Sequence, residues 1–258
     1  MVKAIFFDID GTLVSFETHR IPESAERAIL ALREKGILVF IASGRHLLSI
    51  NNLGSLVFDG YITLNGGYCL AGKEQVIYKH SIPEEDIASL VQYMEEENEF
   101  PCIFIHEHTL YLNYHNEQSH EVFQMLDFPE PPVAPLREAS KGETFQLVAF
   151  FTKEQERAIM EVMPRSEATR WNPLFTDVIP RGSSKSVGID KMLEHFGIAL
   201  DETMAFGDGG NDISMLQHAG IGVAMGNAGD EVKKVADYVT SSVDEDGVIN
   251  ALRHFGVL

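Results

Sequence analysis

The sequence predicts a doubly wound α/β protein whose parallel sheet is interrupted by an inserted α+β module. Short, continuously apolar runs alternate with amphipathic helical patterns at both ends of the chain, as in a parallel sheet that is buried on both faces. Several of these runs end in polar or glycine-rich residues, which mark the change from strand to loop. The middle of the chain contains paired strands with helices between them.

The first part of the core, residues 1–81, begins with a buried strand at Ala4–Phe7. A helix is expected at Pro22–Lys35, because its apolar residues recur at intervals of three and four and a glycine follows it. Further buried strands are expected at Ile37–Ala42 and Tyr61–Leu64. Each is an apolar run that ends in polar or glycine-rich sequence.

The same alternation of strand and helix resumes in residues 181–258, which are expected to complete the core. A helix at Gly188–Phe196 carries apolar residues along one face. The later elements are expected, in order, as a strand at 204–206, a helix at 213–218 and strands at 221–224 and 238–240.

Residues 82–180 are expected to form the inserted α+β domain. It begins with an amphipathic helix at Glu84–Glu97 and a hairpin formed by Cys102–His106 and Thr109–Tyr114. The remaining expected elements are a helix at 118–126, a strand at 145–151, a helix at 153–163 and a strand pair at 168–171 and 175–179. Such paired strands differ from the strand–helix alternation of the core.

Composition excludes several classes of protein. The 258 residues are 45% apolar and 23% charged, as in a globular protein, and 20 cations against 39 anions give a net charge of −19. That charge disfavours nucleic acid and anionic membranes as partners. The apolar runs are too short for a membrane helix, and the N-terminus does not resemble a signal peptide. Two cysteines are too few for a disulfide framework, so the cytoplasm is the expected compartment.

Acidic residues follow two of the predicted core strands. Because ligands bind at the carboxyl ends of parallel strands, the fold is expected to gather four of these acids, Asp8, Asp10, Asp208 and Asp212. Two like charges 4 Å apart repel by about 4 kcal/mol at an effective dielectric near 20. A cation is therefore expected among them, and oxygen ligands of this kind suit Mg²⁺.

Each of these features also has an ordinary structural interpretation. The segment Asp8–Gly11 taken alone is typical of a solvated turn, and Asn211 and Asp212 could simply cap a helix. Lys185 stands near the predicted start of a helix, where a cation opposes the helix dipole. It is either a surface lysine or a group that neutralises a bound anion.

Four segments, in this order, resemble the motifs of the haloacid dehalogenase superfamily: Asp8–Leu13, Ser43–Arg45, Lys185 and Gly207–Asp212. The insertion before Lys185 resembles the cap of the Cof-type, subclass IIB phosphatases, on a Rossmann-like core. The runs Phe6–Pro22 and Phe206–Gly226 are similar to bacterial sugar-phosphate phosphatases that prefer hexose phosphates. One departure is Ser186, where the family usually has glycine.

The resemblance implies a role for each matching residue. Asp8 would attack phosphorus and form an aspartyl-phosphate, and Asp10 would act as general acid and then as general base. Mg²⁺ would be held by Asp8, the Asp10 backbone carbonyl and Asp208, with Asp212 acting through water or as a supporting acceptor. The phosphoryl oxygens would be held by Ser43, Gly44, Lys185 and Asn211, and the Thr12 hydroxyl would support the first loop.

Residues expected to contact the substrate's leaving group are less clearly marked. Asn65 ends a core strand beside the expected site, and Arg170, Trp171 and Asn172 lie at a strand end of the cap. The alternative interpretation of this cap segment is an ordinary core tryptophan and a solvated turn. The histidines at 106–108, 115 and 120 raise the possibility of zinc, but their spacings match no common zinc site.

The sequence thus predicts a cytoplasmic, Mg²⁺-dependent phosphatase that acts on small phosphorylated metabolites, in particular sugar (hexose) phosphates. A phosphomutase using the same aspartate pair is the nearest alternative. A non-catalytic switch that is phosphorylated on Asp8, like a receiver domain, is a more distant one. The expected partner is a small phosphate ester, and the chain is expected to be a monomer or a weak homo-oligomer.

Overall fold

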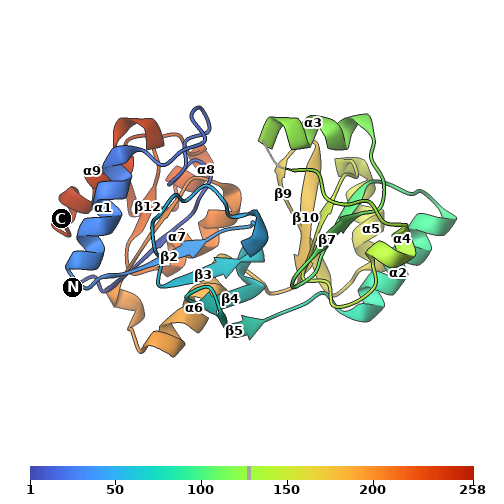
Figure 1. Ribbon diagram of the computed structural model, residues 1–258, viewed down its shortest axis with the longest axis horizontal. Coiled ribbons are helices and arrows are strands. Elements are labelled where there is room, and N and C mark those ends of the chain that lie inside the picture. The colour runs from blue at the N-terminus through green and yellow to red at the C-terminus, as the bar shows by residue number, and fades with distance from the viewer. Residues whose placement is uncertain (127–128) are drawn as a thin grey trace. The chain divides into compact units, whose positions relative to one another are not determined.

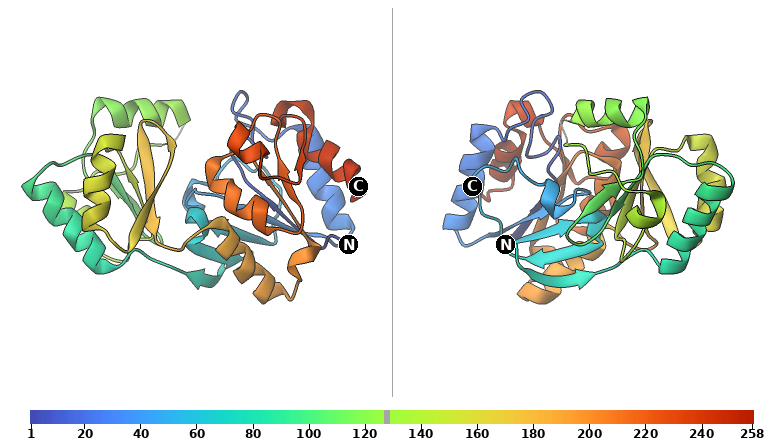
Figure 2. Two further views of the ribbon diagram at one scale, coloured as in Figure 1. Left: turned by 180° about the vertical axis from the view of Figure 1, so that it is seen from behind. Right: turned by 45° about the vertical axis from the view of Figure 1, so that its right-hand side comes forward.

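The computed structural model describes residues 1–126 and 129–258, which form two compact units (Figures 1 and 2). The core unit comprises Met1–Lys79 and Ser184–Leu258, and the cap unit comprises His80–Ser183. Among the described residues, no helix combines the length and apolar character that a membrane crossing requires.

The core contains an eight-stranded sheet of order β13-β12-β11-β1-β2-β3-β4-β5. Its six strands from β13 to β3 are parallel, and β4 and β5 extend the sheet as antiparallel strands. The strands are β1 (Ala4–Phe7), β2 (Leu38–Ala42), β3 (Gly60–Thr63), β4 (Tyr68–Ala71), β5 (Gln75–Lys79), β11 (Thr203–Gly207), β12 (Gly222–Ala224) and β13 (Tyr238–Val239). The predicted α/β class is confirmed, although the sheet is mixed rather than wholly parallel.

Helices cover both faces of the core sheet. On one face, Phe6 and Phe40 pack against Ile189 and Met192 of α6 and against α7. On the other face, α1 contacts β2 and lies beside α9 (Figure 1). The core helices are α1 (Glu23–Glu34), α6 (Lys185–Phe196), α7 (Ile213–His218), α8 (Asp230–Lys233) and α9 (Gly247–His254). Single 3₁₀ turns occur at Leu47–Ser49, Leu64–Gly66, Leu200–Glu202, Gly210–Asp212 and Val243–Glu245.

The cap contains a five-stranded antiparallel sheet of order β7-β6-β8-β10-β9. Its strands are β6 (Cys102–Ile105), β7 (Leu110–Leu112), β8 (Gln146–Ala149), β9 (Ser166–Asn172) and β10 (Phe175–Pro180), and its helices are α2 (Glu84–Glu96), α3 (Glu117–Leu126), α4 (Leu136–Ala139) and α5 (Lys153–Val162). Leu90 and Met94 of α2 and Ile159 of α5 pack on Phe104 and Leu147 of the sheet. This unit has its own apolar core, as the α+β prediction requires.

Two differences from the predicted elements have clear local causes. The β3 strand ends at Thr63, because Leu64 and Asn65 adopt positive φ angles and begin a 3₁₀ turn. Helix α9 is one of the elements that the sequence pattern did not predict. Its apolar residues Val248, Ala251 and Leu252 are buried, so packing in the core supports a helix that the short sequence pattern did not reveal.

Candidate active site

The predicted site residues lie at the carboxyl ends of neighbouring core strands. From β1 the chain builds one half of the sheet through β2 and β3, whereas β11, β12 and β13 build the other half. The order therefore reverses between β1 and β11, which is where α/β sheets bind ligands. Asp8 directly follows β1, and Asp208 directly follows β11.

A buried lysine joins two of the aspartates. Lys185 is the first residue of α6 and has no exposed surface. Its Nζ atom donates hydrogen bonds to Asp8 Oδ1 at 2.6 Å and to Asp212 Oδ1 at 2.5 Å. The structure thus excludes the surface-lysine alternative and places the ammonium group inside the acidic cluster.

The start of α6 is held in place by a close backbone contact. Gly66 has a φ of +91°, and a Cβ atom at this position would overlap the carbonyl oxygen of Ser184. Ser184 caps α6 through its side chain, which accepts a hydrogen bond from the Val187 amide. Only glycine allows both this φ angle and this approach, so Gly66 helps to position Lys185.

Carboxylate oxygens of Asp8, Asp208 and Asp212 lie within 4.8 Å of one another. Burial, reinforced by the neighbouring charge of Asp212, raises the pKa of Asp8 well above its usual range. The same two causes raise the pKa of Asp208 to about 7. Burial lowers the pKa of Lys185, but Asp212 and Asp8 more than compensate and raise it above its usual value. The cluster therefore carries more negative charge than one lysine balances.

Asp208 and Asp212 accept hydrogen bonds from groups other than Lys185. Asp208 Oδ1 accepts a hydrogen bond from the Thr12 hydroxyl at 3.0 Å, and its Oδ2 accepts one from Asn227 Nδ2 at 3.2 Å. Asp212 Oδ2 accepts the backbone amides of Asp208 and Gly209, at 2.9 and 2.8 Å. Because Lys185 donates to the other oxygen of Asp212, this residue is suited to orienting the cluster.

Asp10 is paired with a cation of its own, Arg45. The Nε and Nη2 atoms of Arg45 donate to Asp10 Oδ2 at 2.7 Å and to Oδ1 at 2.5 Å. Such a fork fixes the plane of the carboxylate as well as its position. Sequence reasoning included Arg45 in a motif but assigned it no role. Asn227 was also missed, although it follows β12, the next parallel strand beyond β11.

Of the predicted phosphate-binding residues, Ser43 and Gly44 follow β2 and Asn211 lies after β11, while Asn65, a predicted substrate contact, lies after β3. Ser43 is buried, and its Oγ accepts the Arg45 amide at 3.1 Å; a hydroxyl that accepts can still donate its proton to a ligand. Asn65 Oδ1 accepts a hydrogen bond from Asn211 Nδ2 at 3.0 Å. A Cβ atom on Gly44 would lie 3.2 Å from the Asn65 amide group. The core thus places Ser43, Gly44, Asn65 and Asn211 near one another.

Two of the cap residues predicted to contact substrate, Arg170 and Asn172, have hydrogen-bond partners within the cap. Arg170 donates to Glu156 Oε2 at 3.0 Å and to three backbone carbonyls, those of Phe151, Pro173 and Phe175. Its guanidinium therefore ties β9 to the rest of the cap, which differs from the predicted substrate contact. Asn172 Oδ1 accepts the Leu174 amide at 2.9 Å. Trp171 lies on β9, and its side chain is outside the described part of the structure.

The chemistry of the acidic cluster fits a divalent cation. All three candidate ligands are carboxylates, the hard oxygen donors that Mg²⁺ prefers. Burial raises the pKa values of Asp8 and Asp208, and the negative charges of the neighbouring aspartates, which oppose one another, raise them further. A divalent cation held here would relieve that opposition.

Comparison with known proteins identifies the family. A family model described as haloacid dehalogenase-like hydrolase matches residues 5–252. The chain belongs to the haloacid dehalogenase superfamily. It is 49% identical to a structurally characterised sugar phosphatase of subclass IIB, with a TM-score of 0.93 and complete coverage of both chains. It is a phosphatase of this Cof-type subclass, that is, a phosphoric monoester hydrolase.

Other relatives extend over nearly the same length. YkrA of Bacillus subtilis, whose name describes it as a phosphatase, is 39% identical over 99% of this chain and 98% of its own. The 5-amino-6-(5-phospho-D-ribitylamino)uracil phosphatase YitU of Bacillus subtilis is 30% identical over 97% of this chain and 96% of its own. A structure of a haloalkanoate-superfamily phosphatase from Bacteroides thetaiotaomicron shares 38% identity at a TM-score of 0.92, covering 100% of this chain and 96% of the other.

Proposed function

We propose that this phosphatase hydrolyses sugar phosphates, hexose phosphates in particular, through an aspartyl-phosphate on Asp8 and with Mg²⁺ as cofactor. The observation that carries the proposal is the convergence of Asp8, Lys185 and Asp208 where the strand order of the core sheet reverses. The substrate class is supported by the named activity of the subclass IIB sugar phosphatase at 49% identity.

In the first step, a carboxylate oxygen of Asp8 attacks phosphorus. A phosphorus–oxygen bond forms to Asp8, the bond to the sugar oxygen breaks, and Asp10 gives its proton to the departing alkoxide. Lys185 holds Asp8 Oδ1, so we assign the attack to Oδ2. Arg45 donates hydrogen bonds to both oxygens of Asp10. When Asp10 is protonated, its proton occupies one of these oxygens and weakens the hydrogen bond there, which favours release of the proton.

In the second step, water attacks the phosphorus of the aspartyl-phosphate. Asp10, now a carboxylate, accepts the proton of that water; the bond between Asp8 and phosphorus breaks, and orthophosphate leaves. Asp8 suits the nucleophile because it is hydrogen-bonded to a fixed ammonium group. Asp10 suits the acid and base because its side chain is 35% exposed and can exchange protons with solvent. Ser43, the Gly44 amide, Lys185 and Asn211 would hold the phosphoryl oxygens throughout.

The cation would be held by Asp8, Asp208 and the backbone carbonyl of Asp10, with Asp212 supporting them. When bound, Mg²⁺ neutralises carboxylate charge and draws electron density from a phosphoryl oxygen. Thr12 and Asn227 keep Asp208 oriented toward this position. Asn65 is the core residue we propose to contact the sugar, while Trp171 and Asn172 are the proposed contacts from the cap.

A phosphate-release screen tests the proposal. Hexose phosphates, pentose phosphates and a phosphorylated ribityl compound are each incubated with the enzyme in Mg²⁺ or in EDTA, and orthophosphate is measured. We expect release that needs Mg²⁺, is highest for hexose phosphates and is absent in the Asp8→Asn variant. An isomerised sugar phosphate without orthophosphate would establish a mutase, and an aspartyl-phosphate lasting hours would establish a switch. Either result overturns the proposal.

The remaining expectations about partners and location are part of the same proposal. We propose a monomer or weak homo-oligomer in the cytoplasm, where its two buried thiols, Cys69 and Cys102, stay reduced. The net charge of −19 supports the absence of nucleic-acid and membrane partners. Size-exclusion chromatography with light scattering measures the oligomeric state directly.

A further inference from the structure

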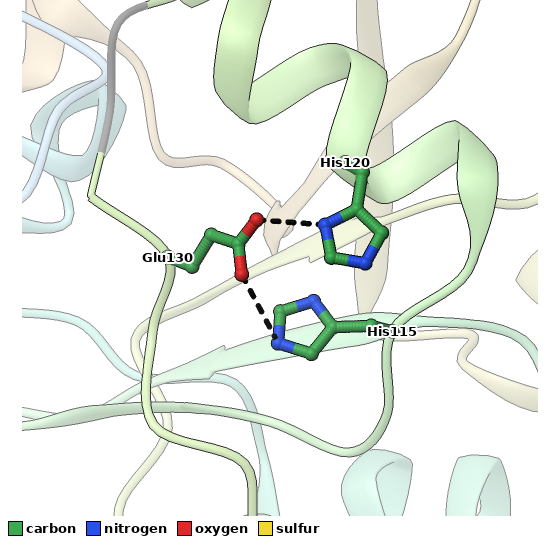
Figure 3. Close-up of side chains that lie close together, drawn as sticks. All are labelled: His115, His120 and Glu130. Atoms are coloured by element: carbon green, nitrogen blue, oxygen red, sulfur yellow. Dashed lines mark hydrogen bonds and ion pairs between the residues drawn. The ribbon is translucent and has the colours of Figure 1, made fainter.

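A second group of metal-ligand side chains lies wholly within the cap. His115, His120 and Glu130 each offer one ligand atom, and these three atoms lie within 4.8 Å of one another (Figure 3). Glu130 Oε1 is 2.7 Å from His120 Nδ1, and its Oε2 is 3.6 Å from His115 Nε2. One carboxylate therefore faces both imidazole rings.

The backbone on both sides of helix α3 fixes these residues. Asn116 and Ser119 cap the helix reciprocally, since each backbone amide donates to the other side chain, at 3.0 and 2.8 Å. The His120 amide donates to the Asn116 carbonyl at 3.1 Å. These bonds set His115 just before the helix and His120 in its first turns.

Glu130 is held by a separate set of contacts. The Leu112 amide of β7 donates to the Pro132 carbonyl at 3.1 Å, and the Ala134 amide donates to the Leu112 carbonyl at 3.0 Å. The segment after α3 is thus attached to β7, the same strand from which the chain continues to His115. All three ligands are consequently anchored close to the end of β7.

The state of the imidazole rings is what points to a ligand. The two rings stack in parallel, with centroids 4.7 Å apart and an interplanar angle of 8°. The Nδ1 atom of His115 is buried without a hydrogen-bond partner in the described structure, and it lies on the side of the ring that faces His120 (Figure 3). A buried polar atom without a partner is destabilising. Two imidazoles beside one carboxylate are also the ligand set of many zinc sites.

We propose that His115, His120 and Glu130 bind Zn²⁺, with water or an external ligand in the fourth position. Small rotations of the three side chains would bring their ligand atoms to the separation that tetrahedral zinc requires, because His120 and Glu130 are 47% and 43% exposed. Bound Zn²⁺ would join the segments before and after α3. This site is distinct from the acidic cluster of the core and does not depend on the proposed substrate.

The competing explanation is a hydrogen-bonded cluster in which Glu130 accepts hydrogen bonds from both histidines. Zinc titration by calorimetry of the full chain, in Mg²⁺ sufficient to saturate the core site, separates the two. We expect one Zn²⁺ per chain, with affinity reduced more than about 100-fold in His120→Ala and in Glu130→Gln, since even outer-shell changes weaken metal binding by about 10–100-fold. His108→Ala is the matched control, because that ring is 84% exposed and outside the cluster.

Two further measurements keep the proposal falsifiable. Phosphatase activity in Mg²⁺ reports whether each variant has folded, since none of these residues belongs to the core site. Co²⁺ added to the Mg²⁺-saturated wild type should give the strong visible absorption of a four-coordinate site, whereas six-coordinate oxygen ligation absorbs weakly. The proposal is overturned if the wild type binds no Zn²⁺ under these conditions. It is equally overturned if His120→Ala and Glu130→Gln bind Zn²⁺ as the wild type does.

Discussion

Replacing Lys185 with methionine would test the electrostatic balance of the core site. Methionine is similar in length and apolar, so the substitution removes the charge and leaves little cavity. In the native protein, the Lys185 ammonium group is fully buried and donates to both Asp8 and Asp212. After the substitution, these two carboxylates face each other without their shared cation.

The expected destabilisation follows from burial. Removing one partner of a buried ion pair typically costs about 3–5 kcal/mol, because the remaining charge stays desolvated. Lys191→Met on the same helix is the matched control: its side chain is 38% exposed and 3.4 Å from Glu194, so we expect a loss below about 1 kcal/mol. The effect of Lys185→Met should also shrink at low pH. Without Lys185, the pKa of Asp8 rises further, and a protonated Asp8 no longer repels Asp212.

Urea unfolding followed by circular dichroism measures this difference, with EDTA present so that no divalent cation compensates. Wild type, Lys185→Met and Lys191→Met are compared at pH 5.5 and pH 8. The reasoning fails if Lys185→Met is destabilised by less than about 1 kcal/mol at pH 8, or by the same amount at both pH values. Mg²⁺ in place of EDTA should recover part of the lost stability.

The remaining predictions concern other parts of the core site. Asp8→Asn should abolish orthophosphate release. Its urea midpoint in EDTA at pH 8 should equal or exceed that of the wild type, because the substitution removes one of the mutually repelling buried carboxylates. A clearly lower midpoint would contradict this expectation. Arg45→Lys should lower kcat more than it raises KM, since lysine cannot donate a planar pair of hydrogen bonds to both oxygens of Asp10. Steady-state kinetics measures the two parameters separately. Gly66→Ala should lose more than about 1 kcal/mol in urea unfolding through its φ of +91°. Finally, the folded protein without metal retains a proton on Asp208 up to about pH 7, which the unfolded chain releases near pH 4. The free energy of unfolding in EDTA should therefore fall as the pH rises from about 4 to about 7. Over the same range, Mg²⁺ should raise the melting temperature by a growing amount. A pH-independent effect of Mg²⁺ would refute the raised pKa of Asp208.

Sequence predicted the acidic half of the core site because two simple rules sufficed. Continuous apolar runs marked the parallel strands, and parallel strands place their carboxyl ends at one edge of the sheet. Asp8 and Asp208, 200 positions apart, could therefore be assigned to one site. The same rule applied to β12 would also have found Asn227, whose amide group reaches Asp208.

Other features depended on packing that no local pattern encodes. Arg45 could have faced solvent or a phosphate, and only the folded loops show that it binds both oxygens of Asp10. Arg170 looked suited to substrate by its position at a strand end, but the cap uses all of its nitrogen atoms internally. The spacing of the cap histidines alone did not indicate a metal site. The third member of the cluster, Glu130, is brought to them only because its segment pairs with β7 in the folded cap.

The charges in the core site explain how so acidic a protein can act on an anionic substrate. Asp10 and Arg45 cancel each other, whereas Asp8, Asp208 and Asp212 exceed the single charge of Lys185 by two. A divalent cation would balance that excess, so that an arriving phosphoryl group would no longer be repelled by the net negative charge of the site. Without the cation, burial and the neighbouring negative charges raise the pKa of Asp8 well above its usual range and that of Asp208 to about 7. A bound cation would lower the pKa of Asp8 and so favour the unprotonated carboxylate, which is the form that the proposed attack on phosphorus requires.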